Sequence, residues 1–226
     1  MAKQFPEISP ALQEFILRQR VFFTASAAAA GRVNVSPRGT DMLRVLGPNA
    51  VVYLDLTGSG NETAAHLRAT GRLTMMFCAF DGAPMILRLY GAGRVLRRGG
   101  PDYARLLEAE YGGAEPLGAR QMVRLDIDLV QTSCGFGVPL FDHAGERPTL
   151  ARWAEAKEKQ EGLEAYRRQK NTHSIDGLPT GLFDPLNKYV ISHLGVLRMI
   201  IMPLLLVLVM IFWPRGMMGK REFRMF

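Results

Sequence analysis

Short apolar segments recur from Val21 to Ser133, and Gly, Pro, Asn and Asp residues separate them. Each segment is rich in β-branched and aromatic residues, which is typical of strands. Seven such strands predict an antiparallel barrel or sandwich, and the absence of regular strand–helix alternation disfavours a doubly wound sheet. The predicted strands are Val21–Ala28, Arg32–Ser36, Leu43–Leu46, Ala50–Leu56, Leu73–Phe80, Met85–Leu96 and Met122–Ser133.

Helical periodicity and capping residues predict peripheral helices around this β structure. Ser9 is expected to cap the first helix, with Pro10 in the first helical position. Two later helices are expected to end at Gly71 and Gly112, and Thr149 is expected to cap the longest one. The predicted helices are Ala11–Gln19, Glu62–Ala69, Pro101–Tyr111 and Thr149–Arg168.

The C-terminal region has a different composition from the rest. The stretch Met199–Trp213 contains no charged or polar side chain. About twenty apolar residues span a bilayer, and extension back to residue 190 reaches that length. We therefore divide the chain into a domain at 1–182 and a linker with a hydrophobic helix at 183–226, in which residues 190–213 span a membrane or lie on its lipid. A helix buried in a dimer interface is the alternative.

Charge and cysteine content narrow the possible partners. The net charge of +7 suits an anionic partner, but no Lys/Arg run with interleaved aromatic residues appears, so we do not expect nucleic-acid binding. Cys78 and Cys134 lie far apart in apolar runs, which predicts two buried thiols and no disulfide. Because the N-terminus has no long apolar run typical of a secretion signal, the domain is expected to be cytoplasmic, with the C-terminal segment as a membrane anchor.

The sequence contains no familiar motif for catalysis, metal binding or nucleotide binding. The four histidines show no metal-ligand spacing, and no Walker loop, nucleophile elbow or G-x-G-x-x-G motif occurs. Gly91 and Gly93 fall inside a predicted strand and are expected to mark a bulge or bend. Any difficult chemistry would therefore come from a bound cofactor, and we expect no metal.

The segment Thr57–Thr63 is the first candidate binding site, because it follows a strand and opens a helix. Its glycines allow a tight turn, and freed N–H groups at a helix N-terminus attract anions. Ser59, Asn61 and Thr63 add neutral donors, whereas Glu62 places a negative charge in the first turn. The alternative is that Asn61 only caps the helix and that the glycines only form a turn.

The segment Val33–Gly39 is the second candidate, in which a strand is expected to end in a Pro-Arg-Gly turn. An arginine held on such a turn can form two parallel hydrogen bonds to a phosphate. Arg38 is that arginine, although an exposed turn arginine usually has no specific role.

Four stretches together resemble the pyridoxamine 5'-phosphate oxidase-like, FMN-binding split-barrel family, and the resemblance covers about residues 5–182. They are Val33–Gly39, Val51–Val95, Ser133–Pro139 (SCGFGVP) and Asn171–Pro179. The resemblance implies a mainly β split barrel with peripheral helices. It also implies a homodimer that holds FMN in clefts between its subunits.

The same resemblance implies which residues meet the flavin. Ser59, Asn61 and Thr63 would contact its phosphate, with Arg38 nearby. Arg88 is a further candidate that could instead pair with Asp81. The full set of implied cofactor-binding residues is Ser36, Arg38, Thr57, Ser59, Gly60, Asn61, Thr63 and Arg88.

The expected function follows from the family, with one departure. Members that oxidise pyridoxamine phosphate carry additional basic residues near the C-terminus, and this constellation is not found here. We therefore expect an FMN-dependent oxidoreductase with a small-molecule substrate other than a vitamin B6 precursor; no catalytic residue is identified. Related split barrels bind a deazaflavin or haem. The alternative is a non-enzymatic flavin- or haem-binding module tethered to the membrane.

Overall fold

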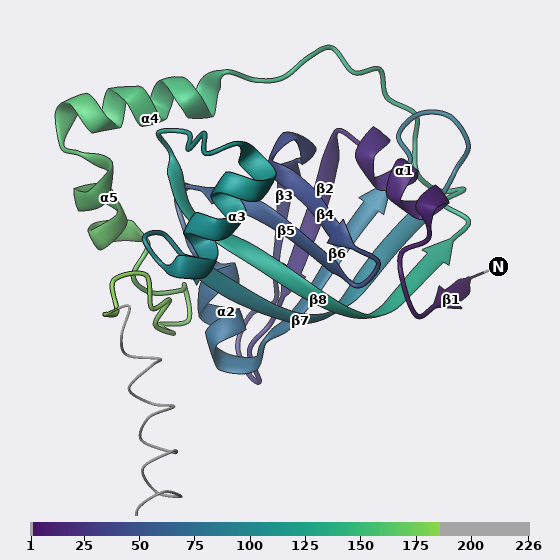
Figure 1. Cartoon of the computed structure of the whole chain (residues 1–226), viewed down its shortest axis with the longest axis horizontal. Helices are drawn as coiled ribbons and strands as arrows, with labels where there is room; N and C mark the ends of the chain where they lie inside the picture. Colours follow the sequence, from purple (N-terminus) through teal and green to yellow (C-terminus); the bar gives the residue numbers. More distant parts are fainter. Residues whose placement is uncertain (1, 186–226) are drawn as a thin grey trace, which may run out of the picture. The chain divides into compact units, whose positions relative to one another are not determined.

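The computed structural model describes residues 2–185, and those up to Phe183 form one compact unit (Figure 1). The strands are β1 Lys3–Phe5, β2 Val21–Ser26, β3 Asn34–Gly39, β4 Leu43–Gly47, β5 Ala50–Leu56, β6 Arg72–Cys78, β7 Ile86–Arg97 and β8 Ala119–Ser133. The helices are α1 Pro10–Arg18, α2 Glu62–Thr70, α3 Pro101–Tyr111, α4 Thr149–Gln160 and α5 Leu163–Lys170, and a 3₁₀ turn, η1, covers Thr40–Met42.

The strands form one antiparallel sheet in the order β3-β2-β6-β7-β8-β5-β4, and β1 pairs with β8. The sheet curls around a core to which α1 contributes Phe15 and Ile16 and α2 contributes Leu67. Mainly β structure, a curled antiparallel sheet and peripheral helices fit a split barrel, as the sequence predicts. β3 lies at one end of the strand order and β5 lies next to the other end.

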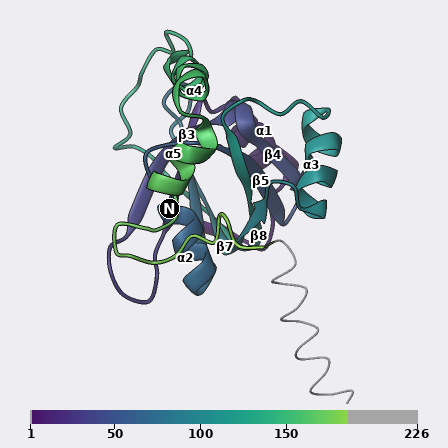
Figure 2. The same ribbon diagram turned by 90° about the vertical axis from the view of Figure 1, so that its left-hand side faces the viewer.

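Strand β5 is buried on both faces, because successive side chains of a strand point in opposite directions. Val51 and Tyr53 pack in the core inside the curl, while Val52 and Leu54 pack in a second core together with α3. Figures 1 and 2 show α3 beside β5 and β4, with α2 near the end of β7. This double burial places the C-terminal end of β5 inside the domain, where Asp55 lies.

Several expected helix ends and the bulge are confirmed. Ser9 Oγ accepts a hydrogen bond from the Leu12 N–H, and Gly71 and Gly112 have left-handed backbone conformations at helix C-termini. The pairing of β7 with β8 shifts register between Tyr90 and Gly91. A Cβ atom at Gly91 would lie 2.0 Å from the Asp126 carbonyl oxygen, so only glycine permits this close approach.

Three other expectations are wrong. The single helix predicted over 149–168 is two helices, because Gly162 adopts φ +80° between α4 and α5. Pro148 occupies the N-cap position of α4, and Thr149 is its first helical residue. Cys134 is exposed, although Cys78 is buried as predicted, and both thiols are free. Cys134 is the first residue after β8 and belongs to the long connection to α4, outside the core.

The predicted hydrophobic helix at 190–213 lies outside the described residues. Within residues 2–185, no helix is both long enough and apolar enough to cross a bilayer.

Candidate anion-binding site

A pocket of about 340 Å³ lies between β3, the end of β5 and the first turn of α2. Six of the eight predicted cofactor-binding residues line it, together with Glu62 and Arg120. These six residues are Ser36, Arg38, Ser59, Gly60, Asn61 and Thr63. Two segments that are separated by about twenty residues in the sequence therefore form one site. From the sequence alone they are two separate candidates.

Arg38 does not sit on a turn, which corrects the sequence-based expectation. Residues 34–39 form strand β3, and Arg38 pairs with Phe22 of β2. The Pro-Arg-Gly sequence predicts a turn, and this prediction is wrong because β3 is an edge strand. At an edge, Pro37 can lack an N–H without disrupting the sheet. Alternation along β3 leaves Val35 exposed and places Ser36 and Arg38 on the pocket side.

Arg38 is held by a carboxylate and an aromatic ring. Its Nη1 atom lies 2.5 Å from Asp55 Oδ1, and its guanidinium carbon lies 4.7 Å from the centre of the Tyr53 ring. Burial favours loss of the proton and is the largest single effect, but the electrostatic interactions with Asp55 and Tyr53 and the hydrogen bond to Asp55 together outweigh it and raise the pKa of Arg38 above its ordinary value. The arginine is therefore a permanent cation at the pocket wall, with 21% of its side chain still exposed.

Asp55 also binds Arg120, which the sequence analysis did not identify. Arg120 Nη2 lies 2.7 Å from Asp55 Oδ2, and Gln121 Nε2 donates to the same oxygen over 2.8 Å. Burial alone would raise the pKa of Asp55, but the charges of Arg120 and Arg38 and these hydrogen bonds lower it. Asp55 thus remains ionised between two arginines.

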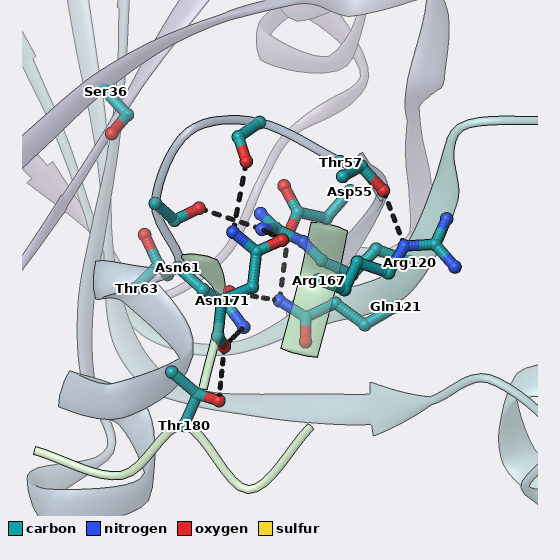
Figure 3. Close-up of polar contacts among 12 residues, drawn as sticks. Ser36, Asp55, Thr57, Asn61, Thr63, Arg120, Gln121, Arg167, Asn171 and Thr180 are labelled. Carbon is teal, nitrogen blue, oxygen red and sulfur yellow. Dashed lines mark hydrogen bonds and ion pairs between the residues drawn. The ribbon is translucent and has the colours of Figure 1, made fainter. Parts of the chain in front are cut away.

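The Asn61 side chain does not cap helix α2, although Asn61 occupies the N-cap position. Its Oδ1 atom accepts from Gln121 Nε2 over 2.8 Å, and its Nδ2 atom donates to the Asn171 carbonyl over 3.4 Å. Figure 3 shows Asn61, Gln121 and Asn171 joined in this way. The capping alternative raised by the sequence is thus not realised by this side chain, which leaves the N-terminal N–H groups of α2 available to a ligand.

The remaining two predicted residues lie elsewhere. Thr57 is buried behind the loop, where its hydroxyl donates to the Gly118 carbonyl and accepts from Arg167 Nε over 2.8 Å. Arg88 lies on β7 and donates to Ser133 Oγ over 2.9 Å. Neither residue lines the pocket in this single chain.

Glu62 has a negative charge that argues against an anion site. Its carboxylate accepts hydrogen bonds from the backbone of residue 175. Both of its carboxylate oxygens accept from the Ile175 N–H, over 3.1 and 3.0 Å. These contacts hold the Glu62 carboxylate beside the backbone of residue 175.

Residues in and behind the pocket form a buried polar network that links β5, β8, α5 and the segment after α5. Asp55 is on β5, Arg120 and Gln121 are on β8, Arg167 is on α5, and Asn171 directly follows α5. The sequence signal for these residues is weak: Asp55 is an acidic residue inside the apolar run VVYLDL, and Arg120 lies two residues before Met122, where a strand is predicted to begin. Charged residues in such positions are rarely buried unless they are paired.

This arrangement is suited to binding an anion. Hydroxyl groups, backbone N–H groups and Arg38 surround the pocket. Asp55 is held ionised, Arg38 is held protonated, and burial raises the pKa of Tyr53 so that its phenol stays neutral. In the described part of the chain, no group of three or more His, Cys, Asp or Glu side chains could hold a metal ion.

Comparisons with known proteins give the family. A sequence model described as pyridoxamine 5'-phosphate oxidase matches residues 8–134. The chain is 42% identical over 190 residues to the pyridoxamine 5'-phosphate oxidase family protein ustO of Aspergillus flavus, a match that covers 77% of this chain and 76% of the relative.

Solved structures with a similar fold include a HupZ variant from Group A Streptococcus and HutZ, the heme storage protein from Vibrio cholerae. The HupZ structure is 15% identical with a TM-score of 0.46, covering 56% of this chain and 99% of the other. For HutZ the values are 17% identity, a TM-score of 0.40, and coverage of 54% and 92%.

The family model and the relative define the class: the chain belongs to the pyridoxamine 5'-phosphate oxidase family. The resemblance found in the sequence alone is thereby confirmed.

Proposed function

We propose that the pocket binds the phosphate of FMN and that the protein is a homodimeric, FMN-dependent oxidoreductase acting on a small molecule. One observation carries this proposal. A permanent cation, Arg38, and the hydroxyls of Ser36, Ser59 and Thr63 line one pocket at the N-terminus of α2. Arginine, hydroxyl donors and a helix N-terminus are the groups that bind phosphate in proteins.

The residues present fit such a group. Gly58 lines the pocket, and a Cβ atom at this position would meet nothing within 4 Å, so the backbone there is open to a ligand. Neither Gly58 nor Gly60 has a positive φ angle, so the turn itself does not require glycine. Close approach of a ligand to the backbone explains glycine better than loop conformation does.

In this proposal the protein binds and orients the cofactor, and the flavin ring supplies the transfer of electrons. Arg38 and the hydroxyls of Ser36, Ser59 and Thr63 would hold the phosphate. Asp55 would keep Arg38 in place and prevent an excess of positive charge inside the domain. The polar residues around the pocket would therefore determine affinity and orientation.

A homodimer would explain the position of Arg88, which lies away from the pocket. Arg88 and Tyr90 point to the outer face of the sheet, on which the half-buried side chains of Phe23 and Met76 also lie. Val35 on β3 is 60% exposed. A second copy packed on this face would cover apolar side chains and could bring Arg88 toward a flavin held between subunits.

A non-enzymatic binding module is the second candidate function. It is favoured by the ionisation of Arg38 in the pocket wall and of Asp55 behind it, since both are held in their charged forms. Such a module would store or sense a flavin or haem, and a deazaflavin is a further possible ligand of the oxidoreductase. Asp55, Arg38 and Tyr53 are thus not poised to exchange a proton, which separates this candidate from an enzyme that would use these side chains for proton transfer.

Purification of the full-length protein from cells without added cofactor tests these alternatives. A flavin absorption spectrum, with FMN identified by the mass of the released compound, supports the first proposal. Reduction by a nicotinamide cofactor and reoxidation by an acceptor would then separate an oxidoreductase from a storage protein. A haem band would favour the second candidate, and a colourless protein that takes up no flavin would contradict the first.

A further inference from the structure

Two carbonyl groups of the loop between β5 and α2 are held by buried side chains. Asn171 Nδ2 donates to the Gly58 carbonyl over 3.1 Å, and Arg120 Nη1 donates to the Gly60 carbonyl over 2.8 Å. In a planar trans peptide the N–H group points away from the carbonyl oxygen. The N–H groups of Ser59 and Asn61 therefore point away from Asn171 and Arg120, and their direction depends on these two contacts.

Asn171 itself is fully engaged and has no exposed surface. Its Oδ1 atom accepts from Arg120 Nη1 over 2.9 Å, its backbone N–H donates to the Arg167 carbonyl, and its carbonyl accepts from Thr180 Oγ1 over 2.8 Å. Figure 3 shows Asn171 between the loop and Thr180. The side chain of Asn171 thus connects the loop to Arg120 of β8, and its backbone connects α5 to Thr180.

The segment Asn171–Thr180 forms a small structure of its own. The Thr180 N–H donates to the Thr172 carbonyl over 2.9 Å, and the Ser174 N–H donates to the Leu178 carbonyl over 2.8 Å. Its outer part is attached by the ion pair between Asp176 and Arg32. It therefore contacts the Gly58–Asn61 loop through Asn171 and the Glu62 carboxylate through the Ile175 N–H, and it is anchored independently at Asp176.

We propose that Asn171 is a positioning residue that holds the Gly58–Asn61 loop in the conformation that binds phosphate, although Asn171 does not line the pocket. The inference rests on the proposed phosphate site. Without Asn171 the Gly58 carbonyl can rotate, which turns the Ser59 N–H and removes a donor from the ligand. Arg120 also loses the amide oxygen that fixes its Nη1 atom beside the Gly60 carbonyl.

The test compares the affinities of FMN and riboflavin for the full-length protein, measured by quenching of flavin fluorescence. Riboflavin lacks the phosphate, so it reports on binding of the ring alone. The variant Asn171→Ala removes both contacts. The variant Asn171→Asp keeps an acceptor for Arg120 and removes the donor to Gly58. Asp176→Asn is the matched control, because it weakens the anchoring of the same segment without touching the loop.

We expect both Asn171 variants to bind FMN roughly tenfold more weakly, about the effect of one lost hydrogen bond to a charged group, and riboflavin unchanged. Asp176→Asn should bind both flavins like the wild type. Equal losses for FMN and riboflavin, or no loss, in whichever Asn171 variant retains the wild-type circular dichroism spectrum would overturn the role of Asn171. A wild-type protein that does not prefer FMN to riboflavin would instead overturn the proposed phosphate site.

Discussion

Arg38 and Asp55 form an ion pair that joins edge strand β3 to β5, two strands that are not paired by backbone hydrogen bonds. Arg38 lies on edge strand β3, Asp55 lies on β5 near the opposite end, and 2.5 Å separates Nη1 from Oδ1. The pair therefore links β3 and β5 across the gap in the split barrel. It also orients the guanidinium of Arg38 in the proposed phosphate site. Asp55 also pairs with Arg120, which connects these strands to β8.

Replacement of Asp55 by Asn should destabilise the protein strongly at pH 7. The change leaves the buried Arg120 without a counter-charge, and removal of one partner of a buried pair costs about 3–5 kcal/mol. Urea denaturation measures this loss. Asp126→Asn is the matched control, because Asp126 also contacts two arginines but its side chain is 44% exposed, against 2% for Asp55. The control should lose no more than about 1 kcal/mol.

The same pair predicts how stability depends on pH. Because folding lowers the pKa of Asp55, its contribution is fully present above the unfolded value of about 4 and is lost as the pH falls through the lower folded value. The wild type should therefore lose stability on acidification below about pH 4, and Asp55→Asn should lose less over this range. Parallel curves for the two proteins would show that Asp55 is not responsible.

Two glycine substitutions should separate binding from folding. A Cβ atom at Gly58 meets nothing within 4 Å, so Gly58→Ala should keep the wild-type melting temperature and weaken FMN binding. Gly91→Ala should lower the melting temperature sharply, because its Cβ would lie 2.0 Å from a backbone oxygen of β8. Unchanged FMN affinity in Gly58→Ala would argue against close approach of the phosphate to this loop.

A charge on the outer face of the sheet should disrupt the proposed dimer. We expect the wild type to be dimeric and Val35→Asp to be monomeric at micromolar concentration in light scattering. Leu17→Asp on α1 is the matched control, since Leu17 is 58% exposed and Val35 is 60% exposed. A wild-type monomer, or a dimer in both variants, would contradict the use of this face.

The C-terminal stretch is predicted to bind membranes. Its apolar run and the basic residues Arg215, Lys220, Arg221 and Arg224 lie in one segment. The full chain should therefore sediment with vesicles that contain anionic lipid, whereas residues 1–185 should stay in the supernatant. Equal behaviour of the two proteins would remove the proposed anchor.

The sequence predicts those features of the fold that depend on the backbone conformation of single residues, such as helix ends and a β-bulge. Gly71 and Gly112 were recognised as helix ends because few other residues adopt the left-handed conformation. Gly91 was recognised as a bulge because glycine in a strand marks close approach. The loop 57–63 and Arg38 were identified as site candidates from residue type, although their shared pocket depends on the tertiary fold.

Interactions between distant residues could not be predicted in the same way. Asp55 and Arg120 are far apart in the sequence, and nothing local indicates that they pair. The Pro-Arg-Gly sequence predicted a turn because local propensity cannot tell that β3 is an edge strand. Asn61 was interpreted as a possible helix cap because its partners, Gln121 and Asn171, come from other elements.

The most direct test of the account is the affinity of Arg38→Ala for FMN and riboflavin. Arg44→Ala is the control, because Arg44 stacks on Tyr111 at 4.5 Å much as Arg38 stacks on Tyr53 at 4.7 Å, yet it lies outside the pocket. The account predicts that Arg38→Ala loses roughly tenfold or more in FMN affinity and keeps its riboflavin affinity, while Arg44→Ala changes neither. Equal losses for both flavins in Arg38→Ala would contradict a phosphate site in this pocket.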